Sequence, residues 1–526
     1  MVRHILKKDW LLLWPFVAAL TVLQALIAWA RFTAGPPPNS VPSVPAAFLL
    51  LLGASMLIAL VVHQDPIPGT RQDWLTRPIG RGDLFLSKLL FVIVLVQGPW
   101  FAADLAQGVA GGFALGQSVA AAAACAVWVL LTLTIPVLAF AALTATTTQT
   151  LVAAIGVLAV LIVPALIGAT SPTALTGFAW VPALVRELLL LGAAIGVLIL
   201  QYRWRRTWAA RALFAGALLV GSGVRFLPWH TAFGLGQLLT ETSRDAQQVV
   251  VVFAPEQGRV RLAPGQGLDD VLERPDFGAA DVAAENQRRR AEGARTVFLP
   301  LRISGLTPTS GLLADRSEVT LVDRDGRRLY HGTGNDLELR ATGTEATVHH
   351  GIRVPGALFG RAKADPVDVQ LEYSFTVFRV NATYALPARD GEQRMPGIGL
   401  CSTGVNDAGT QVLLRCSQPG ERPSCLTVAL EHVPTRQRNP DVSMCAPDYS
   451  PYPGHLLPDA ISRFTGSVPF YDPSGAIRYP VGGPQLADAR VVVTDFRPAA
   501  HFVRRVVVSA VRLQDWEPAA PATAER

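Results

Sequence analysis

Long apolar runs in the N-terminal part of the chain limit most strongly what it can fold into. A membrane-spanning helix needs about 20 predominantly apolar residues, because the hydrocarbon core of a bilayer is about 30 Å thick. Runs close to this length occur at residues 10–30, 45–62, 86–108, 118–143, 151–169, 182–200 and 208–227. We therefore predict an α-helical polytopic membrane domain over residues 1–228, with about seven transmembrane helices. Since further spans follow the first run, we predict an anchor there and not a cleaved leader.

Charge divides the chain into two unlike parts. Residues 1–225 contain 14 Lys and Arg and 6 Asp and Glu, whereas the other 301 residues contain 32 basic and 34 acidic side chains. The basic excess lies in short clusters between apolar runs, which is typical of membrane loops and not of a nucleic-acid-binding surface. We therefore expect a lipid bilayer as a partner and no nucleic acid.

Loop charges predict the orientation. With a cytoplasmic N-terminus, 11 basic residues lie on the cytoplasmic side and three, Arg31, Arg186 and Arg225, lie at or near outer span ends. The positive-inside rule then places the region 229–526 outside the cytoplasm. The last apolar run has 13 uncharged residues between Arg211 and Arg225. A segment this short could alternatively lie flat on the membrane, which would leave the C-terminal region in the cytoplasm.

The longest predicted cytoplasmic loop has a distinctive sequence. Asp65, Pro66, Pro68 and Gly69 form a turn-rich entry. Trp74 and Leu75 give an apolar pair that ends at Pro78, and the next span begins near Lys88. In a purely topological loop, the basic residues would only set orientation and the tryptophan would lie in the membrane interface.

This loop resembles the one between the second and third spans of type-2, exporter-like ABC transporter permeases. The matching residues are Asp65, Gly69, Thr70, Trp74, Leu75, Arg77, Pro78, Ile79, Arg81, Leu84, Lys88 and Leu89. The resemblance covers about residues 1–205 and implies that the loop couples the permease to an ATPase. Trp74 and Leu75 would then dock in a groove of the ATPase, while Arg77 and Arg81 would meet its acidic residues. The seventh span and the large C-terminal region depart from the family pattern.

The resemblance also implies partners and a location. A cytoplasmic ABC ATPase subunit would carry ATP and Mg²⁺, because the chain has no sequence of the form G-x-x-x-x-G-K-[ST] and therefore no cofactor site of that kind. A second permease subunit, identical or related, would complete the transporter. We accordingly expect substrate export across the plasma membrane, the bacterial inner membrane.

After residue 248 the pattern changes to short alternating runs separated by turns, such as Asp323–Gly326. This spacing predicts an all-β, sandwich-like extracytoplasmic region over 229–526. We expect two possible modules, 240–362 and 363–515, followed by a disordered C-terminal tail.

Four of the five cysteines lie close together in this region. Cys401, Cys416, Cys425 and Cys445 predict two disulfides, with three possible connectivities. We favour Cys401 with Cys416 and Cys425 with Cys445, each across one loop. A zinc site is the alternative, but no C-x-x-C pair accompanies the cysteines.

Motifs for catalysis are missing from the sequence. There is no H-E-x-x-H and no G-x-S-x-G. His349 and His350 are neighbours, and neighbours on a strand point to opposite faces, so joint metal binding is not expected. We predict no enzymatic activity, no catalytic residues and no metal site. The competing hypotheses are a membrane-anchored binding or sensory protein and a membrane-anchored enzyme.

Overall fold

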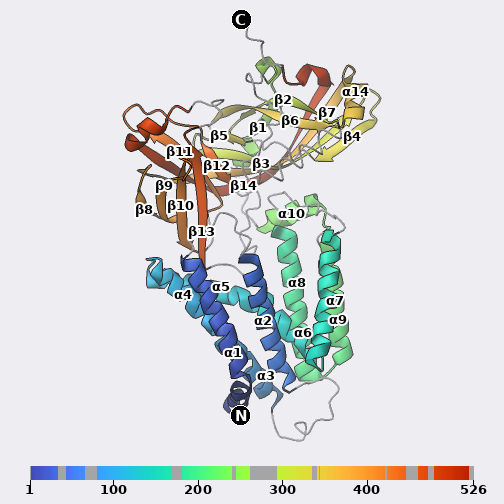
Figure 1. The fold of residues 1–526 in the computed structure, drawn as a ribbon. Helices are drawn as coiled ribbons and strands as arrows, with labels where there is room; N and C mark the ends of the chain where they lie inside the picture. Colours follow the sequence, from blue (N-terminus) through green and yellow to red (C-terminus); the bar gives the residue numbers. More distant parts are fainter. Residues whose placement is uncertain are drawn as a thin grey trace.

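The structure is a computed structural model of the 526-residue chain. It describes residues 2–33, 43–65, 80–166, 180–224, 226–239, 245–260, 293–333, 340–342, 344–420, 423–445, 460–471 and 479–519. In this part of the chain an N-terminal bundle of helices is followed by a β-rich region, with the N-terminus at the end of the bundle farthest from the sheets (Figure 1). The predicted division into a helical and a β-rich part is confirmed.

Helices account for almost all of the described N-terminal part. Their bounds are α1 Val2–Thr33, α2 Ser43–His63, α3 Arg81–Phe91, α4 Gly98–Ala110, α5 Leu115–Val129, α6 Ile135–Ala142, α7 Thr147–Leu166, α8 Trp180–Ile199, α9 Thr207–Val224 and α10 Trp229–Leu239. There are also three π-helical segments in the described part. Segment η2 Val92–Gln97 joins α3 to α4, η3 Leu130–Thr134 joins α5 to α6, and η4 Leu200–Trp204 extends α8. Each of the seven apolar runs overlaps one or more of these helices.

Five helices in the described part are long and apolar enough to cross a membrane. They are Val2–Ala30, Gly82–Ala110, Leu115–Ala142, Trp180–Trp204 and Thr207–Val224. Two further apolar helices, Phe48–His63 and Thr147–Val157, are shorter. Of the roughly seven predicted spans, five are therefore long enough to cross a membrane. The short last apolar run is one of these five. Its helix, α9, runs beside α8 (Figure 1).

The outer surface of the bundle is apolar. Trp29, Leu219 and Val152 are each about two-thirds exposed, and side chains of this size rarely form a continuous exposed surface in water-soluble proteins. Beneath them, buried apolar residues of α1, α2, α3, η2, α6 and α8 form one core. A bundle with a packed interior and an apolar exterior fits a lipid environment.

Strands form three antiparallel sheets in the C-terminal part. The bounds are β1 Val250–Phe253, β2 Arg295–Ser304, β3 Ser310–Val322, β4 Arg328–Thr333, β5 Arg340–Thr342, β6 Glu345–Val354, β7 Pro366–Pro387, β8 Glu392–Met395, β9 Gly399–Val405, β10 Gln411–Pro419, β11 Cys425–His432, β12 Val442–Cys445, β13 Ile461–Pro469 and β14 Ala489–Arg512. The strand orders are β1-β2-β6, then β13-β10-β9-β8, then β12-β11-β14-β7-β3-β4 with β5 beside β3. Two short helices, α11 Asp245–Gln248 and α14 Gly356–Ala362, also belong to this part.

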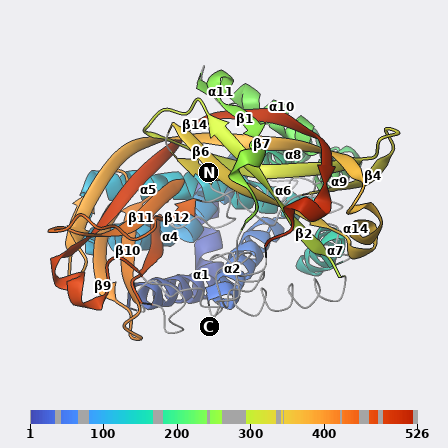
Figure 2. The same ribbon diagram turned by 90° about the horizontal axis from the view of Figure 1, so that it is seen from above.

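The largest sheet supports two separate apolar cores. The first core contains residues 367–377 of β7 and residues 500–511 of β14, packed against β2 and β6. The second contains residues from the opposite ends of the same two strands, packed against β9, β10 and β13. Strands β7 and β14 therefore belong to both cores, and each of the segments 240–362 and 363–515 contributes to the shared sheet. Figure 2 shows these long strands lying over the ends of the helices.

Polar and apolar contacts join the β-rich part to the bundle. His230 of α10 lies 2.8 Å from a carboxylate oxygen of Glu372 on β7. Arg394 of β8 donates a hydrogen bond to the backbone oxygen of Gly112 and lies over the ring of Phe113, in the turn between α4 and α5. Val503 of β14 packs against a small cluster from α8 and α10. The sheets thus rest on the helix ends that lie opposite the N-terminus.

Candidate functional site

Two lysines and two aspartates lie close together, near the start of α1, the end of α2 and the first turns of α3. Lys88 of α3 donates to Asp9 of α1 and to Asp65, which follows α2, and both N–O distances are 2.8 Å. Lys8 donates to the other carboxylate oxygen of Asp65 at 2.9 Å. We call these four residues the helix-end charge cluster. Lys8 and Asp9 lie near the start of α1, and the N-terminus lies at the end of the bundle farthest from the sheets (Figure 1).

The cluster is electrically balanced and mostly buried. The side chains of Asp9 and Lys88 are 0% and 1% exposed, and that of Asp65 is 15% exposed. The second carboxylate oxygen of Asp9 has no hydrogen-bond partner, and Lys8 Nζ lies 3.7 Å from it. Charges taken out of water are tolerated only when they are paired, so each aspartate depends on both lysines.

The charges around Asp65 favour its ionised form. Burial alone would raise the pKa of this carboxyl group, but Lys88 and Lys8 together outweigh burial and hold the pKa below its ordinary value. Asp65 is therefore a carboxylate at neutral pH. Its two oxygens connect the lysine of α1 to the lysine of α3.

The charge cluster contains the first and one of the last residues of the predicted coupling loop. Asp65 opens the loop directly after α2, and Lys88 lies on α3, where the loop sequence leads into the next span. Gly69, Trp74, Leu75, Arg77 and Pro78 lie outside the described residues. Arg81 is the first residue of α3, and its side chain is likewise outside the description. Of the loop residues named in this paragraph, the structure thus brings Asp65 and Lys88 together.

Sequence reasoning missed Lys8 and Asp9 as members of this site. The signal was an acidic residue directly before an apolar run, because a carboxylate at the entry of a membrane span requires a partner. Lys8 is one of the 11 basic residues that predict a cytoplasmic N-terminus. The choice of Lys88 as the main partner of Asp9 depends on the packing of α1 against α3.

A second polar group lies at the same end of the bundle. His63, at the end of α2, has Nε2 3.0 Å from Thr144 Oγ1 and 3.2 Å from Thr150 Oγ1. Arg211 of α9 donates to the backbone oxygen of Leu143 at 3.0 Å. These contacts tie α2 and α9 to the turn between α6 and α7. The helix ends on this side are therefore held by side-chain contacts as well as by packing.

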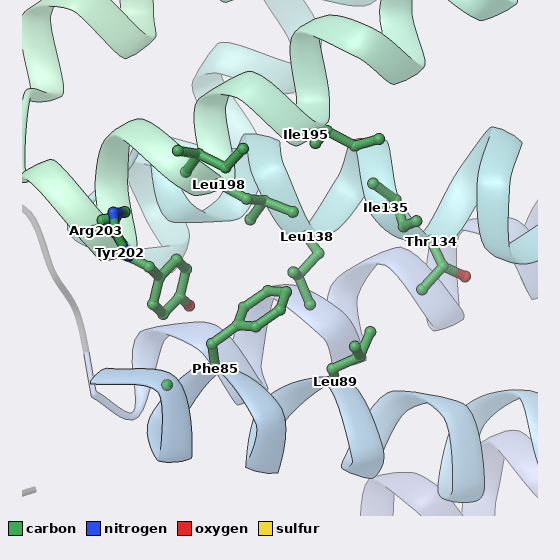
Figure 3. A pocket seen from close by; sticks show the side chains of 11 residues that line it. Phe85, Leu89, Thr134, Ile135, Leu138, Ile195, Leu198, Tyr202 and Arg203 are labelled. Carbon is green, nitrogen blue, oxygen red and sulfur yellow. The ribbon is translucent and has the colours of Figure 1, made fainter. Parts of the chain in front are cut away.

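An apolar cavity of about 640 Å³ opens beside α3, α6, α8 and η4. Its lining residues are Gly82, Phe85, Leu89, Thr134, Ile135, Leu138, Ile195, Leu198, Ile199, Tyr202 and Arg203. Figure 3 shows Tyr202 and Arg203 at one end and Thr134 at the other. Phe85 and Tyr202 meet edge to face, with ring centroids 5.2 Å apart.

The four cysteines of the β-rich part form two disulfides. Cys401 pairs with Cys416 between β9 and β10, and Cys425 pairs with Cys445 between β11 and β12. Both pairings are those favoured from the sequence, and each joins directly opposite residues of an antiparallel pair. Cys125 is buried in α5 and forms no disulfide.

Among the described residues, no group of three or more His, Cys, Asp or Glu side chains is arranged to hold a metal ion. His349 and His350 lie on β6, where His350 is buried and His349 is only partly buried. The expected separation of the two rings onto opposite faces is confirmed. His350 instead packs edge to face on Tyr373 inside the first core.

No family model and no curated protein matches the chain. Among solved structures, a transglutaminase from red sea bream is similar at 10% sequence identity and a TM-score of 0.10. That match covers 45% of this chain, which spans 34% of the transglutaminase chain.

Proposed function

We propose that this chain is the membrane-spanning subunit of an ABC transporter, which couples ATP hydrolysis on a separate cytoplasmic subunit to substrate export. The observation that carries the proposal is the helix-end charge cluster. Asp65, directly before segment 66–79, pairs with Lys8 of α1. Lys88, on the helix after that segment, pairs with Asp65 and with Asp9 of α1. A force applied to that segment would therefore act on the ends of α1, α2 and α3 together.

The resemblance of the loop to permease coupling loops gives the force a source. Trp74 and Leu75 would contact the ATPase subunit, and Arg77 and Arg81 would pair with its acidic residues. The ATPase would bind ATP and Mg²⁺, and this chain would supply the path for the substrate. A second permease subunit, identical or related, would complete that path.

Charge pairing supports a mechanical role for the cluster. An uncompensated buried charge costs about 3–5 kcal/mol, so the four groups resist being pulled apart. The helices they join are expected to move as one unit when the loop moves. The disulfides of the β-rich part favour an oxidising compartment, so we propose that the helix-end charge cluster lies on the cytoplasmic side of a bacterial inner membrane and the sheets lie outside.

Co-purification tests the proposal. The chain is expressed with a tag together with any Walker-containing ATPase encoded beside its gene, and the ATPase recovered is measured for wild type, Trp74→Ala and Arg77→Ala. We expect at least a fivefold loss of ATPase in both variants, because each removes a predicted contact. Lys7→Ala is the matched control, since Lys7 is exposed on α1 at the same end of the bundle and makes no predicted contact with the ATPase.

Recovery that is unchanged in both loop variants would overturn the coupling role. If wild type recovers no ATPase although the two proteins are expressed at equal levels, the chain is better explained as a membrane-anchored binding or sensory protein. Equal losses in Lys7→Ala and the loop variants would show that the ATPase associates through general surface charge and not through the predicted loop contacts.

A further inference from the structure

The cavity beside η4 has apolar walls and polar residues at its ends. Phe85, Leu138 and Leu198 lie along its length (Figure 3). Its volume of about 640 Å³ falls within the roughly 300–1,000 Å³ of typical small-molecule sites. The hydroxyl oxygen of Thr134, at one end, accepts a hydrogen bond from Gln97 at 2.7 Å. A long apolar group is the ligand chemistry that fits such walls.

The cavity reaches the outer surface of the bundle. Ile195 and Ile199 line it and are each 44% exposed. Both lie within the membrane-length helix Trp180–Trp204. A cavity that opens beside such residues faces hydrocarbon in a bilayer, so an acyl chain could enter it sideways without passing through water.

The end of the cavity near Arg203 is basic. Arg203, Arg205 and Arg206 are exposed there, and Trp204 and Trp208 are 58% and 82% exposed. Arginine and tryptophan collect at membrane interfaces, where headgroups lie. Two acidic side chains are also close: Asp83 follows Gly82 on α3, and the charge of Asp65 acts on Tyr202, but Asp65 is paired with Lys8 and Lys88. Arg203 lines the cavity itself, and the neighbouring Arg205 and Arg206 add basic charge that favours an anionic group at this end.

Lipid selection must come from the headgroup. An acyl chain gains no hydrophobic free energy when it moves from lipid into a protein cavity, because both surroundings are apolar. A basic residue at a membrane surface, in contrast, attracts anionic lipid by about fivefold. The apolar walls therefore accept the chain of any phospholipid, and the arginines decide which phospholipid is retained.

We propose that this cavity binds one acyl chain of an anionic phospholipid whose phosphate lies against the Arg203 guanidinium. The site lies beside the helix-end charge cluster, because Leu89 of its lining follows Lys88 on α3, and it does not depend on an ATPase partner. Its three π-helical neighbours support a specific role: η3 carries Thr134, η4 carries Tyr202 and Arg203, and η2 carries the Gln97 that donates to Thr134. Such segments occur frequently at functional sites.

Native mass spectrometry of the full chain tests this proposal. The protein is placed in nanodiscs containing equal amounts of dioleoylphosphatidylglycerol and dioleoylphosphatidylcholine, and the lipids retained after gentle release are counted. We expect wild type to retain one phosphatidylglycerol, with a preference of about fivefold or more. Arg203→Ala should lower that preference by about fivefold. Lys7→Ala is the matched control because it removes an exposed basic residue at the same end of the bundle, away from the cavity lining.

Filling the cavity gives a second, independent measurement. Ile195→Trp places a large apolar side chain at the rim, where the native residue is already partly exposed, and should abolish retention of the lipid while circular dichroism shows an unchanged helix content. Equal loss of preference in Arg203→Ala and Lys7→Ala would overturn the proposal. Undiminished lipid retention in Ile195→Trp would also overturn it. If Ile195→Trp instead disrupted a dimer of the chain and left the bound lipid unchanged, the rim would be a contact between two copies of the chain and not a lipid site.

Discussion

At the scale of single residues, buried charges and buried histidines determine how this chain responds to substitution and to pH. Lys88 is the most consequential side chain, because it is 1% exposed and contacts two carboxylates. Its loss would leave Asp9 buried beside Asp65, with Lys8 as the remaining cation of the cluster. No apolar substitution at position 88 can replace the missing charge.

Replacing Lys88 with methionine should therefore lower the free energy of unfolding by about 3–5 kcal/mol, the cost of an uncompensated buried charge. Thermal unfolding of the detergent-solubilised full chain measures the effect. The double variant Asp9→Leu/Lys88→Met removes both fully buried charges and should recover much of the loss. A single variant as stable as wild type would show that the cluster is not paired as described.

His350 and His501 are neutral in the folded β-rich part. Burial lowers the pKa of each to about 4, from an ordinary value of 6.5. The unfolded chain binds protons on these rings below pH 6.5, whereas the folded chain does not until about pH 4. Their contribution to stability is therefore complete above pH 6.5, falls as the pH drops toward 4, and amounts to about 3 kcal/mol for each ring.

Replacing His350 with phenylalanine should remove about half of this pH dependence. The measurement is the urea midpoint of the full chain at pH 7.5 and at pH 5, for wild type and variant. His349→Phe is the control, because His349 is the neighbouring ring on β6 and is only partly buried. An unchanged difference between the two pH values in His350→Phe would contradict the assignment of the effect to this ring.

At the scale of elements, tight packing between α4 and α5 depends on one glycine. A Cβ atom added at Gly108 would lie 2.7 Å from Ser118 Cβ and 2.6 Å from its hydroxyl oxygen. Ser118 is buried, at 1% exposure, and has little room to withdraw. A Cβ atom at Gly116, at the start of α5, would meet nothing within 4 Å.

Gly108→Ala should therefore destabilise the chain by about 1–3 kcal/mol through overpacking, although alanine favours helix over glycine by about 1 kcal/mol. Gly116→Ala should leave the melting temperature unchanged or raise it. Adding Ser118→Gly to Gly108→Ala removes the clashing Cβ and should restore part of the stability. Equal melting temperatures for the two alanine variants would contradict close contact at this point.

Elements also show why parts of the fold could be predicted and others could not. Apolar runs located the helices, because a bilayer demands both length and apolarity. The alternating runs 489–496 and 502–513 are separated in the sequence by Pro498, and the strand register shifts at the same place. In the structure both belong to one 24-residue strand. The pairing of Asp9 with Lys88 was beyond local patterns, since it joins residues 79 positions apart.

At the scale of the whole molecule, the helix-end charge cluster and the disulfide-bearing sheets lie at opposite ends of the helical bundle (Figure 1). If the bundle crosses a bilayer, these two ends face different compartments. The excess of basic residues near the N-terminal end predicts that this end is cytoplasmic. The two disulfides predict an oxidising compartment at the other end, so two independent signals agree on one orientation.

Cysteine labelling of whole cells checks that orientation. Lys7→Cys and Arg415→Cys place one reactive thiol at each end, because both native residues are exposed, while the native cysteines are either in disulfides or buried. A membrane-impermeant maleimide should label Arg415→Cys in intact cells, and Lys7→Cys only after permeabilisation. Labelling of both from one side would mean that an even number of segments crosses. Since α9 is the shortest membrane-length helix, that result would place α9 on the membrane surface and the sheets on the same side as the helix-end charge cluster.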